Sequence, residues 1–165
     1  MILFLDYDGV LHPDAAFLEK GRPVLRGEGA LFMWSRYLQD VLVSHPQVEI
    51  VISSSWCRVF GFSRAKWFLP PSLQPRVIGG TWHSSMARSE FGGFKMPHTW
   101  WDSATRYEQI IRYVRRARLE HWLAVDDNNE GWAEVDADRL ILTDPNKGVS
   151  DPHVLSALHE KLAAW

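Results

Sequence analysis

Two carboxylates stand one residue apart near the start of the chain, directly after an apolar run. Asp6 and Asp8 follow Ile2–Leu5, and Gly9 comes just behind them. Carboxylates this close repel each other unless a cation or a shared proton compensates, and oxygen ligands of this kind suit Mg²⁺. A capped turn would also account for the pair. The residue types therefore favour a metal site without requiring one.

A second acidic pair follows another apolar run. Asp126 and Asp127 come directly after Trp122–Val125. Alone, this pair can equally be the N-cap of a helix. If both apolar runs are strands of one parallel sheet, their carboxyl ends meet at the edge where such sheets bind ligands. Together, the two pairs predict one divalent-cation site.

Groups suited to holding a phosphate also occur. Ser53, Ser54 and Ser55 end a third apolar run, and hydroxyl and backbone N–H groups at a strand end can bind phosphate oxygens. Arg106 lies in the first turn of a predicted helix, from which its guanidinium could reach over the strand ends. A serine-rich loop and a solvated arginine are the simpler interpretations of each signal taken alone.

The elements that would position these residues alternate between short apolar runs and helical patterns. This alternation favours a three-layer, Rossmann-like α/β fold, with a parallel sheet and helices on both faces. Apolar residues recur at helical spacing over 31–42, 107–114 and 155–162, and Thr105 with Glu108 forms a capping box. The expected strands are Ile2–Leu5, Val48–Ser53, Arg76–Ile78, Trp122–Val125 and Leu140–Thr143.

Two segments fit this alternation poorly. The first, near 12–27, contains Pro13, Gly21 and Pro23 and predicts a flap-like excursion or hairpin. The second, near 79–104, is rich in Trp, Gly and Pro. Long loops in a compact domain are often functional. No internal repeat or low-complexity tract divides the chain, so we expect a single domain over residues 1–165.

Bulk composition narrows the class of protein. The 165 residues are 46% hydrophobic and 23% charged, which is ordinary for a globular domain. No apolar run approaches the roughly 18 residues of a membrane span, and we expect neither a membrane partner nor a signal peptide. Cys57 is the single cysteine, so no intrachain disulfide can form, which suits a cytoplasmic protein.

Charge is unevenly distributed along the chain. Residues 57–118 contain eleven Lys or Arg against three acids, whereas 119–165 contain three Lys or Arg against ten acids. A basic middle could steer an anionic substrate toward a metal-binding pocket. Solvated helix faces are the simpler explanation for the basic run 112–118. The overall net charge of -2 argues against a general nucleic-acid coat.

The order of these groups resembles the haloacid dehalogenase-like (HAD) superfamily of phosphatases and phosphotransferases. The resemblance runs from Ile2 to about Gly148 and is most specific at "DYDGVL", with a moderate match at "AVDD". The stretches "DYDGVLHP", "SSSW" and "LTDPNKG" look most like the small bacterial HAD domains of RNA-repair proteins.

The resemblance implies a mechanism for the acids. Asp6 would be the nucleophile that forms an aspartyl-phosphate, and Asp8 would act as general acid and then as general base. Mg²⁺ would be held by Asp6, the backbone carbonyl of Asp8 and Asp126, with Asp127 assisting. Because both acids of the first pair are present, the resemblance favours phosphoester hydrolysis over dehalogenation.

The resemblance also implies how the phosphoryl group is held. Ser54 would bind it, in preference to Ser53. The cationic position is usually a lysine in this superfamily. Arg106 is placed correctly for that role, and Lys95 is its competitor because a loop could carry it inward. The sequence leaves this choice open.

Both gaps that hold cap domains in relatives are short here, so the resemblance implies a capless domain, or one with a minimal cap, and an open site. A phosphorylated substrate such as a nucleotide or a nucleic-acid end would then be acceptable. The alternatives are a small-metabolite phosphatase and a non-catalytic phosphate- or protein-binding module of the same fold.

Several ring side chains lie near the predicted site. Trp100 and Trp101 could stack bases, and packing of their large side chains in the core is the alternative. Trp56 and Trp67 are expected to pack in the core. His12 directly follows the first motif and is a candidate for substrate contact, with a structural role as the simpler interpretation.

Overall fold

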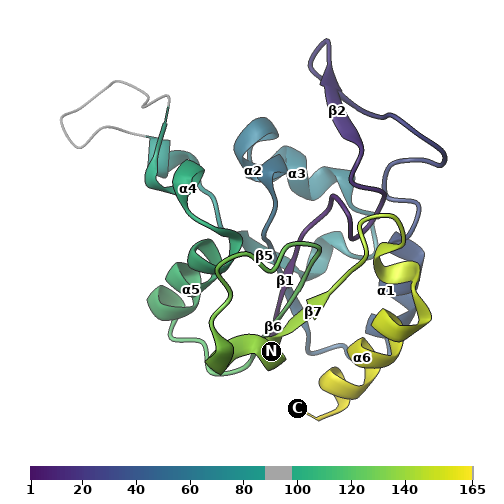
Figure 1. Cartoon of the computed structure of the whole chain (residues 1–165), viewed down its shortest axis with the longest axis vertical. Helices are drawn as coiled ribbons and strands as arrows, with labels where there is room; N and C mark the ends of the chain where they lie inside the picture. The colour runs from purple at the N-terminus through teal and green to yellow at the C-terminus, as the bar shows by residue number, and fades with distance from the viewer. Residues whose placement is uncertain (88–97, 165) are drawn as a thin grey trace.

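A five-stranded parallel sheet forms the centre of the computed structural model, which describes residues 1–87 and 98–164 (Figure 1). The strand order is β5-β4-β1-β6-β7, so β1, the first strand in the sequence, is central. The strands are β1 (Ile2–Leu5), β4 (Glu49–Ile52), β5 (Val77–Gly80), β6 (Trp122–Asp126) and β7 (Leu140–Leu142). This sheet confirms the predicted α/β fold class.

The register of the three central strands aligns their carboxyl ends. Leu5 pairs with Ile52 of β4 on one side and with Val125 of β6 on the other. All four residues of β1 are buried, as an apolar strand covered on both faces requires. Because the pairing ends at the same level, the first residues beyond β1 and β4 and the last residue of β6 are neighbours.

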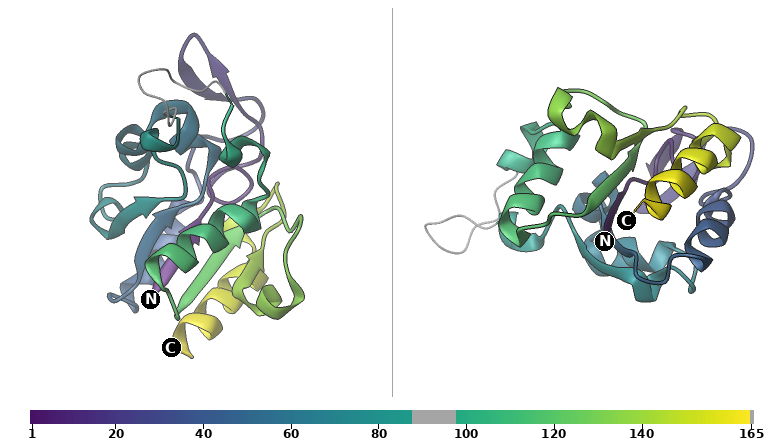
Figure 2. Two further views of the ribbon diagram at one scale, coloured as in Figure 1. Left: turned by 90° about the vertical axis from the view of Figure 1, so that its left-hand side faces the viewer. Right: turned by 90° about the horizontal axis from the view of Figure 1, so that it is seen from below.

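Helices cover both faces of the sheet (Figure 2). Leu3 and Leu5 of β1 face a large core to which α1 (Ser35–Val43) and α6 (Pro152–Ala163) contribute. Ile2 and Phe4 face the opposite side, where Ile110 of α5 packs. The alternation of side chains along a strand thus divides the apolar residues between two layers.

Helix α5 (Arg106–Ala117) begins where the sequence predicts. The Thr105 hydroxyl accepts from the backbone N–H of Glu108, and the Glu108 carboxylate accepts from the N–H of Thr105, at 3.2 and 2.8 Å. Arg118 ends the helix in a left-handed conformation, with φ 53°. The capping box therefore places Arg106 as the first helical residue.

The remaining helices are short. They are α2 (Ser55–Phe60), α3 (Phe62–Phe68) and α4 (Trp100–Ser103), with 3-10 turns η1 (Gln74–Arg76), η2 (Ser84–Ala87), η3 (Glu134–Arg139) and η4 (Gly148–Ser150). In the part of the chain that is described, no helix is both long and apolar enough to cross a membrane.

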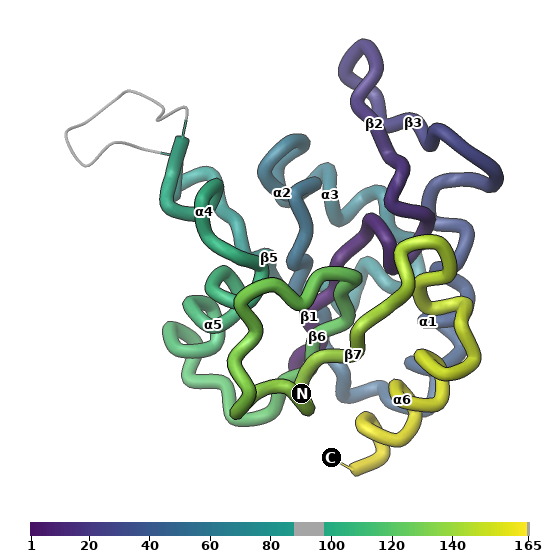
Figure 3. Tube along the Cα trace, viewed as in Figure 1, coloured from purple at the N-terminus to yellow at the C-terminus, as the bar shows by residue number. Residues whose placement is uncertain are grey.

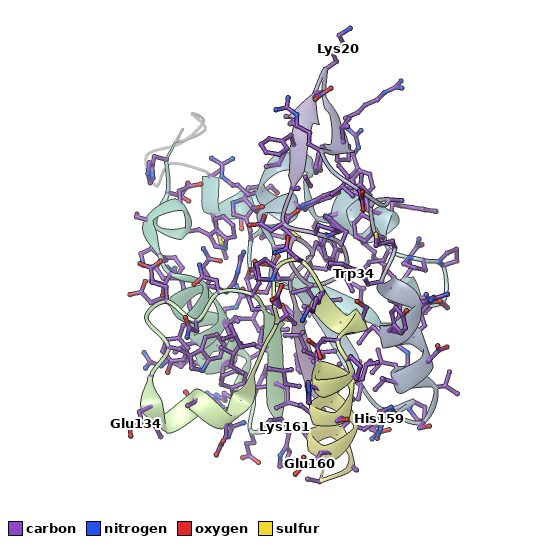
Figure 4. All side chains as sticks on the ribbon, turned by 45° about the vertical axis from the view of Figure 1, so that its right-hand side comes forward. Lys20, Trp34, Glu134, His159, Glu160 and Lys161 are labelled. Carbon is purple, nitrogen blue, oxygen red and sulfur yellow. The ribbon has the colours of Figure 1, made fainter. Side chains whose placement is uncertain are left out.

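A two-stranded antiparallel hairpin projects from the body of the molecule (Figures 3 and 4). Strands β2 (Ala16–Glu19) and β3 (Arg22–Leu25) are joined by Lys20 and Gly21. Both turn residues have positive φ, 48° and 77°, as a tight hairpin turn of the primed type requires. The excursion predicted near 12–27 is this hairpin.

The structure corrects one prediction about the aromatic residues. Trp56 is buried, at 4% exposure, but Trp67 on α3 is 74% exposed and does not belong to the core. Helix α3 buries Ala65 on its inner face, and Trp67, two residues further along, is directed to the other side. Sequence hydrophobicity alone placed it wrongly.

Candidate active site

The carboxyl ends of β1 and β6 bring three carboxylates together. Asp6 follows β1 directly, Asp126 ends β6, and Asp127 is the next residue. One oxygen from each of these three acids lies within 4.8 Å of the others. Asp6 and Asp126 are almost completely buried, whereas Asp127 is half-buried. The two acidic pairs of the sequence thus meet at one edge of the sheet.

The Arg106 guanidinium lies between two of these acids. Its Nη2 donates to Asp6 Oδ2 at 3.0 Å, and its Nε lies 3.0 Å from Asp126 Oδ2. Its Nη1 donates to Gln109 Oε1 at 3.1 Å, and the amide of Gln109 donates in turn to the Trp101 carbonyl at 2.9 Å. One turn of α5 therefore fixes the position of the cation.

One guanidinium does not neutralise the cluster. Burial raises the pKa of Asp6 and, more strongly, that of Asp126, against the lowering effect of Arg106. Burial and the nearby Asp6 charge raise the pKa of Asp127 to about 6. Burial acts to lower the pKa of Arg106, but Asp6 and Asp126 together raise it. The site contains more negative charge than its own residues compensate.

The residues fit a magnesium ion. Among the described residues, Asp126 Oδ2 is a buried oxygen with no hydrogen-bond partner, although Arg106 is at ion-pair distance. An unpaired buried carboxylate oxygen is costly unless a cation compensates it, and three carboxylates are donors that Mg²⁺ accepts. Asp6, Asp126 and Asp127 are the side chains that could hold the ion.

The side chain of Asp8 is not part of this cluster and has two partners of its own. His12 Nε2 lies 3.1 Å from its Oδ1, and Trp56 Nε1 donates to its Oδ2 at 2.8 Å. Both carboxylate oxygens are therefore fixed, while about a fifth of the side chain remains exposed. Two acids separated by one residue thus face different surroundings, which allows them different chemical roles.

His12 is a buried structural partner of Asp8. Its ring lies 5.0 Å from the Phe32 ring and 5.6 Å from that of Trp56, measured between centroids. Within the described residues its Nδ1 has no hydrogen-bond partner. Placing the proton on Nε2 leaves only a bare lone pair unsatisfied, which costs less than a buried N–H. In this tautomer His12 donates to Asp8.

The serines at the end of β4 also reach the site. The Ser54 hydroxyl accepts from the Trp56 backbone N–H at 3.4 Å and lies near enough to Asp6 to lower the pKa of that carboxyl. The Ser53 hydroxyl is buried and has no partner among the residues described. Ser54 thus lies directly beside the predicted nucleophile. Lys95, the competitor of Arg106, lies outside the described residues.

Gly9 shapes the turn that follows the first acidic pair and lies against Asp127 of the second pair. Its φ is +66°, and an added Cβ would overlap the carboxylate of Asp127. Its carbonyl accepts from the Thr143 hydroxyl at 2.8 Å, which ties this turn to the end of β7. A side chain at position 9 would displace Asp127 from the cluster.

The sequence interpretation missed one residue of this site. Trp56 was assigned to the core, and it is buried there, but its indole N–H also holds Asp8. The available signal was its place directly after the serine run, at the start of α2. The Trp56–Asp8 contact spans 48 positions, so no local pattern indicates it.

Residues 2–154 match the family model described as the HAD domain in Swiss Army Knife RNA repair proteins. The chain belongs to this family. HAD domains are generally phosphatases, so membership indicates a phosphoester hydrolase or a related activity, and the family typically uses Mg²⁺. Comparisons with curated proteins and with solved structures found no significant match. The expected resemblance to RNA-repair HAD domains is confirmed.

Proposed function

We propose that this HAD domain is a Mg²⁺-dependent phosphoester hydrolase that works through an aspartyl-phosphate on Asp6. The separate environments of Asp6 and Asp8 carry the proposal. Asp6 is buried beside Arg106 and Ser54, two groups that could hold a phosphoryl group against it. Asp8 is part-exposed and fixed by two donors, as a proton-transfer group next to a departing alcohol requires.

In the first step, a carboxylate oxygen of Asp6 forms a bond to phosphorus and the ester P–O bond breaks. Asp8 gives its proton to the departing oxygen, which leaves as an alcohol. In the second step, Asp8 takes a proton from water, the water oxygen attacks the phosphorus of the acyl phosphate, and Asp6 is released with inorganic phosphate. Protons and electron pairs balance over the two steps.

The other residues bind and orient. Arg106 and Ser54 would hold the phosphoryl oxygens against Asp6, since both already contact that carboxylate. When bound at Asp6, Asp126 and Asp127, Mg²⁺ would supply positive charge that offsets repulsion between the carboxylates and the phosphate. His12 and Trp56 would keep Asp8 in one orientation.

A nucleotide or a nucleic-acid end is the substrate class we favour. The family description refers to RNA-repair proteins, and the segment that follows the first acidic pair forms a small two-stranded hairpin and not a folded cap domain. The alternatives are a small-metabolite phosphatase and a non-catalytic binding module. A panel of 3′- or 5′-phosphorylated oligonucleotides, nucleotides and sugar phosphates separates them, because turnover restricted to sugar phosphates would refute the favoured class.

Asp6→Asn tests the mechanism. The change is nearly isosteric and removes the nucleophile, so we expect hydrolysis to fall by at least about 10³-fold while the far-UV circular dichroism spectrum is unchanged. EDTA should abolish wild-type turnover, and Mg²⁺ should restore it. Full activity in the variant, or in EDTA, would contradict the mechanism.

A further inference from the structure

A small pocket opens beside Asp8, between the hairpin and helix α2. Its volume is about 100 Å³. Phe17, Leu18 and Pro23 line it from the hairpin, and Val59 and Phe60 line it from α2. The hairpin and α2, which are far apart in the sequence, therefore line one space at the edge of the candidate active site, to which Asp8 and Ser55 add polar groups.

Several of the apolar residues that line the pocket lie outside the core. Phe17, Leu18 and Val59 are 48%, 57% and 55% exposed. Large apolar side chains gathered on two facing elements commonly mark a binding surface. The Arg26 guanidinium lies 4.5 Å from the centre of the Phe17 ring, a cation–π contact that helps to hold this ring in place.

Asp8 and Trp56 connect the pocket to the proposed chemistry. Both residues line the pocket, and the Trp56 indole donates to Asp8 at 2.8 Å. Under the proposed function, Asp8 protonates the departing oxygen, so the group attached to that oxygen must emerge next to this space. The pocket is thus placed to receive the leaving group and not the phosphate.

The geometry points to a leaving-group subsite that accepts one uncharged, apolar ring. This inference rests on the proposed function and deepens it. Among the described residues of the lining, Asp8 is the one ionisable side chain and Ser55 supplies the one hydroxyl. A polyol or a charged group would lose its hydration there with few partners in return, whereas a flat ring matches both the volume and the walls. A nucleobase and an aryl group share this chemistry.

Phosphonates test the subsite without requiring turnover. We would titrate the wild-type protein, with Mg²⁺ present, with 2-phenylethylphosphonate and with ethylphosphonate. The two probes carry the same charged group and differ in the ring. Burying one ring face in the pocket should make the phenylethyl compound bind about tenfold more tightly by calorimetry. Equal affinities would overturn the inference and leave the proposed function standing.

A pair of valine variants locates the effect. Val59→Asn makes the pocket wall polar, whereas Val43→Asn makes the same change on α1, at a residue that is 76% exposed and outside the pocket. The tenfold ring preference should fall to about twofold in the first variant and persist in the second. A preference that survives in Val59→Asn would contradict the assignment. If neither phosphonate binds the wild type, the proposed function fails together with the inference.

The source of the ring is distinguished with nucleic-acid ends. An oligonucleotide with a terminal 3′-phosphate is compared with the same oligonucleotide whose terminal base is missing. Tighter binding of the intact end, lost in Val59→Asn, would assign the pocket to a nucleobase. A ring preference confined to the phenylethyl probe would assign it to an aryl ester.

Discussion

At the scale of residues, the site depends on giving two neighbouring acids different partners. Asp6 lies beside the Arg106 guanidinium and two other carboxylates, whereas Asp8 is held by an indole and an imidazole. The orientation of Asp8 is fixed by side chains that never need to touch the phosphate. Positioning groups of this kind affect the proton-transfer step more than substrate binding.

Trp56→Phe removes the N–H that holds Asp8 and keeps most of the buried ring. We expect hydrolysis of an alkyl phosphate, which needs a proton donor for its poor leaving group, to slow about tenfold. Hydrolysis of 2,4-dinitrophenyl phosphate, which needs little proton transfer, should change less than about threefold. Steady-state kcat on the two esters is the measurement.

Trp82→Phe is the matched control for this experiment. Trp82 is also a buried tryptophan, at 6% exposure, and its Nε1 has no partner within the described residues. The Trp82→Phe substitution should change kcat for the two esters by the same factor. An equal slowing of both esters by Trp56→Phe would mean that Trp56 acts through packing alone.

Asp127→Asn should change how stability depends on pH in EDTA. The pKa of Asp127 is raised from 3.8 to about 6 in the folded protein, so the folded state binds this proton more tightly than the unfolded state does. The stabilisation from that proton is present below about pH 4 and is lost as pH rises through 6. The variant should therefore gain stability relative to wild type between pH 4 and pH 7, as followed by urea denaturation. A pH-independent difference would contradict this.

At the scale of elements, the turn after β1 is supported by the segment after β7. The backbone N–H of Val149 donates to the Val10 carbonyl at 2.9 Å, and the Trp34 N–H donates to the Leu11 carbonyl at 3.0 Å. Gly148 makes this close approach feasible, because its φ is +50° and an added Cβ would overlap the Val10 carbonyl and the Trp34 ring.

Gly148→Ala should destabilise the protein by about 2 kcal/mol or more, because left-handed strain and steric overlap both oppose the methyl group. Thermal and urea unfolding measure the effect. Gly21→Ala is the control, since Gly21 has φ +77° with no atom within 4 Å of the added Cβ. That variant should cost only about 1 kcal/mol. Equal losses would show that the overlap at Gly148 is relieved by a backbone shift.

Elements with a strong local signal were predictable from the sequence. Ile2–Leu5 is a strand as expected because it is a short apolar run followed by a turn, whereas the strand expected at Arg76–Ile78 is displaced to Val77–Gly80. Gly79 and Gly80 have no apolar side chain to mark them as strand residues, so the sequence pattern ends the strand before them. Their pairing with Val51 and Ile52 of β4 nevertheless keeps them in the sheet. Long-range pairing is the information that a local pattern lacks.

The candidate site also contains some residues whose positions can be predicted from the sequence and others whose contacts cannot. The positions of Asp6 and Asp126 followed from strands that end in acids, and that of Arg106 followed from the capping box before it. The partners of Asp8 depend on how α2 packs over β1, which no spacing in the sequence specifies. The exposed Trp67 was misjudged because a large aromatic side chain is a poor guide to burial on a short helix.

At the scale of the whole molecule, the carboxylates at the carboxyl edge of the sheet repel one another, and a bound cation would reduce this repulsion. Mg²⁺ should bind the folded state and raise its melting temperature by roughly 5 °C or more at saturating concentration. Asp126→Asn should abolish most of this shift. Asp40→Asn, which removes an exposed carboxylate on α1, should retain it, as differential scanning fluorimetry can measure. No shift in the wild type would mean that the cluster does not bind the ion.

The central place of β1 has a consequence for synthesis on the ribosome. Within this domain, β1 is made before both of its neighbours, β4 on one side and, about 120 residues later, β6 on the other. Until residue 126 has left the exit tunnel, one flank of β1 is an open hydrogen-bonding edge of the kind that recruits foreign strands. A chaperone that shields this edge would therefore be needed most during translation, and premature stop codons before β6 should yield aggregates in place of partly active fragments.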